Sequence, residues 1–359
     1  MSIFFKTYFD AMSDVKSGVY GVASSSEWRP ALGTGLSGFW KRAKFSVGLA
    51  FREKEIITFA VLQWACVAAG YFLWVRMIGW IPPSVWHDVG RQHGSGIAGL
   101  ILFVWSFVVV GVVAFPLGLL SGCMGAVHFL NRQGHESTIV RCLKIVLPEA
   151  WPIWIFQWID GWWTVNRILD RLPKKNGGGS IEQVMAEPLY YAWKLATIGI
   201  LPGLVTGRGL LDAGKRSVGL VHDRFADVAI LRAGYSALCW IIGVGTYIGT
   251  IYFFIAFPRL VNFHAPVELG IFKFYFWAGV PMMAAVGAVM LFLHPVYVIS
   301  SCDIYADYVT KRGENLMLPP PPGGTRWRSA AGAAVLLILL LAAVTLFRDR
   351  LGITGLLSR

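Results

Sequence analysis

The sequence predicts an all-α, polytopic integral membrane protein. Hydrophobic residues make up 56% of its 359 residues and charged residues only 14%, whereas soluble domains carry about 25% charged residues. Several apolar runs reach the roughly 20 residues that a helix needs to cross a bilayer. The mean hydropathy is +0.58, and the 16 Trp and 40 Gly residues are typical of membrane helices and their interfaces.

A four-residue phrase, Ser-Val-Gly-Leu, occurs twice and divides the chain. The first copy begins at Ser46 and the second at Ser217, 171 residues later. Each copy lies in a basic segment and is followed by a charged turn, a membrane-length apolar run, a short loop and a second apolar run. We therefore predict two parallel repeats of a basic helix plus a transmembrane hairpin, one over residues 40–131 and one over residues 206–310.

The first part of the chain predicts one surface helix and two spans. Aromatic and charged side chains alternate through residues 1–39 with the spacing of an amphipathic helix on a membrane, and Gly33–Gly38 predicts a loop. The apolar run over 56–74 predicts the first span. Residues 94–130 contain no Asp, Glu, Lys or Arg. This run is longer than a bilayer requires, so we expect its helix to tilt, protrude or break near Pro116.

The middle insert, residues 132–205, has no counterpart in the repeat. Its apolar stretch 146–168 holds five Trp but is interrupted by Pro and acidic residues, and a second short run, 192–205, contains Lys194. Two alternatives follow: two full spans, or membrane-dipping elements that enter from the cytoplasm and return to it. The basic loop 171–180 favours the membrane-dipping elements, because Lys and Arg concentrate in cytoplasmic loops.

The second copy and the C-terminal region complete the predicted topology. Spans are predicted over 228–257 and 271–300, a stiff Pro-rich linker over 311–328, and a C-terminal transmembrane helix with its tail over 329–359. Lys and Arg gather before each hairpin, whereas each hairpin loop holds one. Because positive charge stays inside, we predict that both hairpins start and end in the cytoplasm. The expected location is a bacterial inner membrane, with the N-terminus cytoplasmic.

Four ionisable side chains in or beside the apolar runs are candidates for a polar site, because such groups are costly in a membrane. His128 and His294 lie near the returning ends of the two hairpins. They form either a paired proton or ligand site or two separate contacts at the headgroup level. Glu149 and Asp160, eleven residues apart, would share one helix face. They either bind a cation or form the polar face of an interfacial helix whose Trp side chains lie in the headgroups.

Basic residues around the repeated phrase are predicted to contact anionic lipid headgroups or an acidic partner, or else only to hold the hairpin ends in the cytoplasm. These residues are Lys41, Arg42, Lys44, Lys215, Arg216 and Arg224. The placement of this charge beside apolar runs predicts lipid, and not nucleic acid, as the partner. The five Cys show no ligand spacing, so neither a metal site nor a cofactor is predicted. Glycines spaced through 118–125 and 245–249 predict close helix contacts.

Two phrases carry a resemblance to a bacterial family. Residues 207–224 read Gly-Arg-Gly-Leu-Leu-Asp-Ala-Gly-Lys-Arg-Ser-Val-Gly-Leu-Val-His-Asp-Arg, and residues 304–314 read Ile-Tyr-Ala-Asp-Tyr-Val-Thr-Lys-Arg-Gly-Glu. Both resemble segments of the uncharacterised polytopic proteins similar to the membrane domain of glycerophosphoryl diester phosphodiesterases, over residues 40–315. Gly214 stands where Leu is usual in that family. The resemblance implies helices in two related hairpins, and it implies no activity.

The sequence leads to one function hypothesis and two alternatives. The leading hypothesis is a non-enzymatic scaffold or subunit of a membrane assembly of the transport or secretion type, in contact with lipids and with helices of other membrane proteins or of a second copy. The first alternative is a transporter or channel with a site between the hairpins, since duplicated hairpins and Pro-broken helices are common in transporters. The second is a lipid-modifying enzyme, for which the sequence offers no nucleophile or metal motif.

Overall fold

The computed structural model describes residues 28–78, 96–170, 190–257, 273–314 and 318. Within these ranges all regular secondary structure is helical, as the sequence predicts, and they contain no strand. The helices are α2 (Trp28–Arg52), α3 (Lys54–Ile78), α5 (Gly96–Arg132), α6 (Ile139–Val146), the 3₁₀ turn η1 (Leu147–Glu149), α7 (Ala150–Asp170), α9 (Ile200–Val205), α10 (Leu210–Asp223), α11 (Phe225–Ala256), α12 (Lys273–Ala288), the π-helix η3 (Val289–Leu293) and α13 (His294–Lys311). Residues 190–196 are also helical.

Four helical stretches of the described chain are long and apolar enough to cross a membrane. They cover Lys54–Arg76, Val104–Arg132, Phe225–Ala256 and Gly279–Lys311. They coincide with the two spans predicted in each hairpin, so the predicted helical fold with candidate membrane-spanning helices is confirmed. Membrane insertion and the repeat stay predictions. The predicted C-terminal span lies outside the described residues, as do residues 1–27 of the predicted amphipathic segment.

The loop predicted at Gly33–Gly38 is wrong, because α2 runs through it. Glycine costs a helix about 1 kcal/mol relative to alanine, but most helix stability in proteins comes from packing of one face. Phe39 of α2 is 9% exposed and fills the space beside Gly234 of α11, where an added Cβ would lie 2.7 Å from Phe39 Cζ. Ser46 Oγ lies 2.9 Å from Ser300 Oγ of α13. Contacts with α11 and α13 therefore outweigh the weak local propensity.

Both basic segments end in the same local structure. Glu53 alone separates α2 from α3, and Arg224 alone separates α10 from α11. In each copy of the repeated phrase the serine is 0% exposed, and the leucine is 5% exposed in the first copy and 1% in the second. Each basic helix thus turns its Ser-Leu face inwards just before an apolar helix begins.

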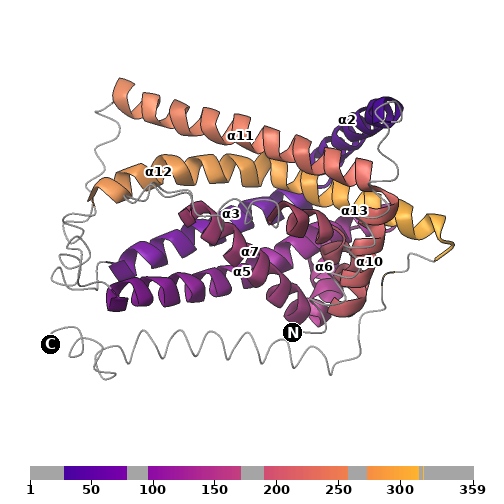
Figure 1. Ribbon diagram of the computed structural model, residues 1–359, viewed down its shortest axis with the longest axis horizontal. Helices are drawn as coiled ribbons and strands as arrows, with labels where there is room; N and C mark the ends of the chain where they lie inside the picture. The colour runs from indigo at the N-terminus through magenta and orange to yellow at the C-terminus, as the bar shows by residue number, and fades with distance from the viewer. Residues whose placement is uncertain (1–27, 79–95, 171–189, 258–272, 315–317, 319–359) are drawn as a thin grey trace.

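The long helices lie lengthwise beside one another. α3 packs against α5, and α11 against α12; Figure 1 shows these pairs as neighbouring layers, with α13 continuing beyond α12. α6 and α10 gather at the end of the bundle where α13 finishes (Figure 1). Large side chains with relative exposure of 0–1% lie on α5 and α13 at this end, among them Met124, Phe129, Leu130, Ile299 and Tyr305. The core therefore sits towards one end of the bundle.

The insert folds against α5 through closely approaching glycines. A Cβ at Gly118 would lie 2.9 Å from Ile153 Cγ2, and a Cβ at Gly122 would lie 2.8 Å from Val146 Cγ1. The close contacts predicted from the glycine spacing at 118–125 are therefore confirmed. At Gly245 and Gly249 an added Cβ would meet nothing within 4 Å, so this second glycine pair faces away from the described part of the chain.

Candidate functional site

His294 ends a buried polar chain that joins three helices. Gln63 of α3 donates from Nε2 to the Leu117 carbonyl (3.1 Å) and to Ser121 Oγ (2.7 Å), both on α5. Ser121 Oγ lies 3.1 Å from His294 Nε2 at the start of α13. Gln63 is 0% exposed and Ser121 is 2% exposed, so these contacts hold the ring in one orientation. In a neutral ring whose Nε2 accepts a hydrogen bond from the Ser121 hydroxyl, the ring proton is on Nδ1.

The backbone next to His294 departs from a regular α-helix. Val289–Leu293 form the π-helix η3, and Pro295 directly follows His294. Proline lacks an N–H to donate, and its ring clashes with the carbonyl one turn earlier, which favours a wider turn at this point. Single-turn π segments inside helices occur frequently at functional sites.

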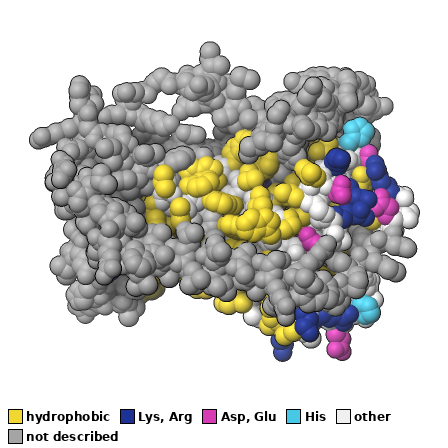
Figure 2. Space-filling model, turned by 90° about the horizontal axis from the view of Figure 1, so that it is seen from below, with side chains coloured by type: hydrophobic (Ala, Val, Ile, Leu, Met, Phe, Trp, Pro, Cys, Tyr) yellow, Lys and Arg dark blue, Asp and Glu magenta, His cyan; other side chains and the backbone are white. Residues whose placement is uncertain are grey.

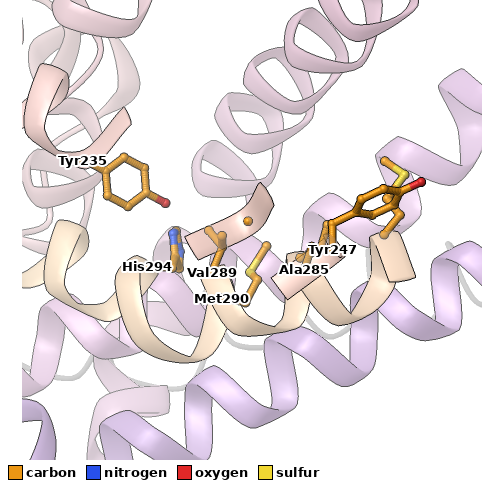
Figure 3. Close-up of a pocket in the computed structure, with 9 residues that line it drawn as sticks. Tyr235, Tyr247, Ala285, Val289, Met290 and His294 are labelled. Atoms are coloured by element: carbon orange, nitrogen blue, oxygen red, sulfur yellow. The ribbon is translucent and has the colours of Figure 1, made fainter. Parts of the chain in front are cut away.

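A mostly apolar cavity of about 230 Å³ lies beside this π-helix, between α11 and α12. Figure 3 shows Tyr235 and His294 at one end of the space and Tyr247 at the other, with Val289 and Met290 between them. An apolar cavity of about 150 Å³ already holds benzene. The space next to His294 therefore has room for a larger apolar group, with a few hydrogen-bonding side chains at its ends.

His128 lies in a different environment from His294. It is 2% exposed, its ring contacts Phe45 edge-to-face at 6.1 Å, and its Nε2 lies 3.9 Å from Asp303 Oδ1. Within the described residues neither of its ring nitrogens has a hydrogen bond. Seven residues of α5, roughly 10 Å of helix, separate it from Ser121, the partner of His294. The structure does not bring the two histidines together as a pair.

Asp160 is paired with residues that follow the insert's basic loop. Its Oδ2 lies 2.5 Å from Lys194 Nζ, and its Oδ1 accepts a hydrogen bond from Trp193 Nε1 at 3.2 Å. Glu149 lies apart from this pair, in the turn η1 before α7. The sequence showed Lys194 as the one charge in the run 192–205, and this was the signal that could have predicted the pair.

Two Trp side chains of the insert make hydrogen bonds to the backbone of a neighbouring helix, and their predicted position in lipid headgroups stays a prediction. Trp154 Nε1 donates to the Gly111 carbonyl at 2.7 Å, and Trp158 Nε1 donates to the Phe107 carbonyl at 3.1 Å. Their rings stack on each other at 5.3 Å. The indole N–H groups therefore anchor α7 to the backbone of α5.

Arg232 of α11 is a site residue that the sequence reasoning missed. Its guanidinium lies 5.9 Å from the centre of the Tyr235 ring and 5.7 Å from that of Tyr297, and the two rings are 4.4 Å apart. Tyr235 also lines the cavity next to His294. The signal was present in the sequence, because an arginine inside the apolar run 228–257 is a functional candidate by default.

Three of the six basic residues predicted to contact lipid or a partner are bound to carboxylates inside the protein. Arg42 pairs with Asp227, Asp303 and Asp307, Arg216 with Glu314, and Arg224 with Asp227. Contact of these arginines with a headgroup stays a prediction, and the carboxylates on neighbouring helices would compete with it. Lys41, Lys44 and Lys215 are exposed.

The two phrases that carry the family resemblance contact each other. Arg208 Nη2 lies 3.0 Å from Glu314 Oε2, and Arg216 pairs with the same carboxylate. The hydrogen bond from Arg216 lowers the pKa of Glu314 below its ordinary value. Arg312 Nη2 lies 3.0 Å from Asp223 Oδ2. These ion pairs fasten the end of α13 to both ends of α10.

No metal centre is visible in the part of the chain that the structure describes, since it contains no group of three or more His, Cys, Asp or Glu side chains arranged to hold an ion. Family models, curated proteins and solved structures all give no match to this chain. The resemblance to the phosphodiesterase-associated membrane family therefore stays a prediction.

Proposed function

We propose that this chain is a non-enzymatic, multi-pass protein of a bacterial inner membrane that serves as a scaffold or subunit of a larger membrane assembly. It contacts lipids and the helices of partner membrane proteins or of a second copy. The observation that carries the proposal is α11. This helix has a 32-residue span of mean hydropathy 1.8, and 0% of its most apolar window is buried.

The exposed face of α11 would be untenable in water. Trp240, Ile241, Ile248, Tyr252 and Ile255 are each 59–72% exposed, and soluble monomers rarely expose a contiguous apolar patch of this kind. In a bilayer the same surface meets lipid or another helix, where small residues such as Gly245 and Gly249 permit close approach. Membrane insertion with an outward-facing α11 accounts for both features.

The distribution of charge supports a cytoplasmic location for one end of the bundle. Figure 2 shows acidic, basic and histidine side chains gathered at one end, beside hydrophobic side chains along the middle. This end holds the ion pairs of Arg42, Arg132, Arg216 and Arg224. By the positive-inside rule, this charge supports a cytoplasmic position for that end, and with it for the N-terminal side of α3 and α11.

Contacts between α5 and α13 support the proposed pair of parallel repeats. Ser121 meets His294 at a sequence separation of 173, and Arg132 meets Asp303 and Asp307 at separations of 171 and 175. These separations lie close to the 171 residues between the two copies of the repeated phrase. The returning helices of the two proposed hairpins therefore run side by side in nearly equivalent register.

Photo-crosslinking from α11 tests the scaffold proposal. A photoreactive residue is placed at Ile248, which is 59% exposed, and in a control at Leu231, which is 4% exposed. We expect Ile248 adducts with lipid and with a discrete protein band in native membranes, and none from Leu231. If the chain purifies as a lone monomer and forms lipid adducts only, the scaffold role is refuted. If the chain is recovered in the soluble fraction, membrane insertion itself is refuted.

A transporter or channel is the second candidate, favoured by the Gln63–Ser121–His294 chain beside a π-helix and a cavity. Polar side chains and irregular helices near the middle of a span are typical of transport sites. Flux of ions and small solutes into liposomes holding the full chain is compared between His294→Ala and the exposed control His135→Ala. Flux that only His294→Ala removes would support transport, and no flux above empty liposomes would exclude it for the solutes tested.

A further inference from the structure

Arg232 carries a charge that nothing in the described part of the chain neutralises. It lies seven residues after the start of α11 at Phe225, roughly 10 Å along the helix. Its neighbours Tyr235 and Tyr297 bring aromatic rings, which have no net charge. Asp160 is near enough to act on the guanidinium, but it is already bound to Lys194 at 2.5 Å. Together Asp160, Lys194 and Arg232 leave one excess positive charge.

An excess charge inside an apolar helix calls for a compensating anion. Ionised side chains in membrane spans are costly and pair with an opposite charge or face a cavity. Cation–π contacts are weak beside the cost of an unpaired charge in a membrane span. The guanidinium also has five N–H donors in a planar fork suited to phosphate. Arg232 therefore has the charge and the geometry of a phosphate-binding group.

The cavity between α11 and α12 begins one helical turn further along α11. Tyr235 contacts the guanidinium of Arg232 on one side and lines the cavity on the other. From Tyr235 to Tyr247 the cavity follows α11 over twelve residues, roughly 18 Å, and its side walls are apolar (Figure 3). Met282 at its rim is 50% exposed, so the space opens where a bilayer would lie.

We propose that Arg232 and this cavity bind one anionic phospholipid of the cytoplasmic leaflet. The phosphate lies at Arg232, the ester groups lie against the hydroxyl of Tyr235 and the ring of His294, and one acyl chain enters the cavity. Charge complementarity selects an anionic over a zwitterionic headgroup. The volume of about 230 Å³ admits part of one chain. This inference rests on the proposed membrane insertion and adds to it a defined lipid site.

Native mass spectrometry of the full chain in mild detergent tests the site. Equal amounts of phosphatidylglycerol and phosphatidylcholine are added, and bound lipid is counted. We expect one phosphatidylglycerol to be retained selectively. Arg232→Gln should weaken its binding roughly ten-fold, as loss of a charge-assisted hydrogen bond predicts, while Arg232→Lys keeps part of it. Lys311→Gln, which removes an exposed charge from the same end of the bundle, should change it little.

A matched glycine pair tests the cavity without altering any charge. A Cβ at Gly243 would lie 3.8 Å from Val289 Cγ2 at the cavity wall, whereas a Cβ at Gly245 would meet nothing within 4 Å. Gly243→Leu should therefore displace the lipid, and Gly245→Leu should not. Equal binding of the two lipids, retention by Arg232→Gln, or equal effects of the two leucine variants would overturn the site. Selective retention of oleate instead would overturn the phospholipid as occupant. If the chain is not found in membranes, the proposed membrane function itself is refuted.

Discussion

The repeated Ser-Val-Gly-Leu phrase offers a matched perturbation, because its two glycines have different surroundings. An added Cβ at Gly48 would meet nothing within 4 Å, whereas one at Gly219 would lie 2.6 Å from the Tyr308 hydroxyl. Alanine at Gly48 should stabilise α2 by up to about 1 kcal/mol, the difference in helix propensity. Alanine at Gly219 gains the same propensity in α10 but overlaps a side chain that is 3% exposed and has little room to move.

The expected difference between the two variants follows from the cost of overpacking. Inserting a methyl group into a filled core costs about 1–3 kcal/mol, so Gly219→Ala should be less stable than Gly48→Ala by about that amount. Tyr308→Phe removes the clashing oxygen and leaves the ring carbon Cζ at 3.7 Å, an ordinary contact. The loss caused by Gly219→Ala should therefore shrink or vanish in the Tyr308→Phe background.

Thermal unfolding of the full chain in mild detergent, followed by circular dichroism, measures this order. We expect Gly48→Ala to melt at or above the parent protein and Gly219→Ala to melt below it. The four combinations at positions 219 and 308 form a double-mutant cycle that isolates the contact. Equal melting temperatures for the two alanine variants, or an undiminished loss in the Tyr308→Phe background, would refute the close approach of α10 and α13.

Three further predictions use the same unfolding measurement. Ser217→Ala should cost about 1–3 kcal/mol, because the buried Gly199 N–H loses its acceptor at 2.9 Å, and a cost no larger than that of Ser46→Ala would contradict this. Tyr305→Phe should preserve or raise stability by about 1 kcal/mol, since its buried hydroxyl has no hydrogen bond among the described residues; a loss would reveal a partner. Glu314 has a lowered pKa, so its ion pairs stabilise the fold fully at pH values above the ordinary glutamate pKa. This contribution to the free energy of unfolding is lost as the pH falls through the lowered pKa. Glu314→Gln should remove that part of the acid dependence.

The long apolar helices could be predicted from sequence because they depend on composition alone. A run such as 94–130, without a single charged residue, has no stable alternative to a helix once it is removed from water. The loop at Gly33–Gly38 failed for the opposite reason. The loop was predicted from local glycine content. The helix there is stabilised by the contact between Phe39 and Gly234, two residues almost two hundred positions apart in the sequence. Local helix propensity determines the secondary structure only where tertiary packing is absent, because packing contributes more to helix stability.

The polar contacts could be predicted only in part, since their partners come from distant segments. His294 and Asp160 were found as ionisable groups in apolar surroundings, but their partners Ser121 and Lys194 are ordinary residues at separations of 173 and 34. Arg232 was passed over because its run was read as an uninterrupted span. Tyr235 follows it by three residues on the same helix, but the neighbour Tyr297 becomes visible only when α11 and α13 are placed side by side.

The basic residues divide by type, and the division explains how one end of the bundle both holds the fold and meets its surroundings. Arginine offers a rigid, weakly hydrated fork that matches carboxylates, whereas lysine is a compact, strongly hydrated charge. Arg42 accordingly bridges carboxylates on α11 and α13, and Arg216 closes α10 onto Glu314. Lys41, Lys44 and Lys215 stay exposed, and in the proposed membrane location each would contribute about 1 kcal/mol to attraction by an anionic surface. The sequence pattern alone does not separate these two roles. It does not show that the three arginines lie beside carboxylates of neighbouring helices.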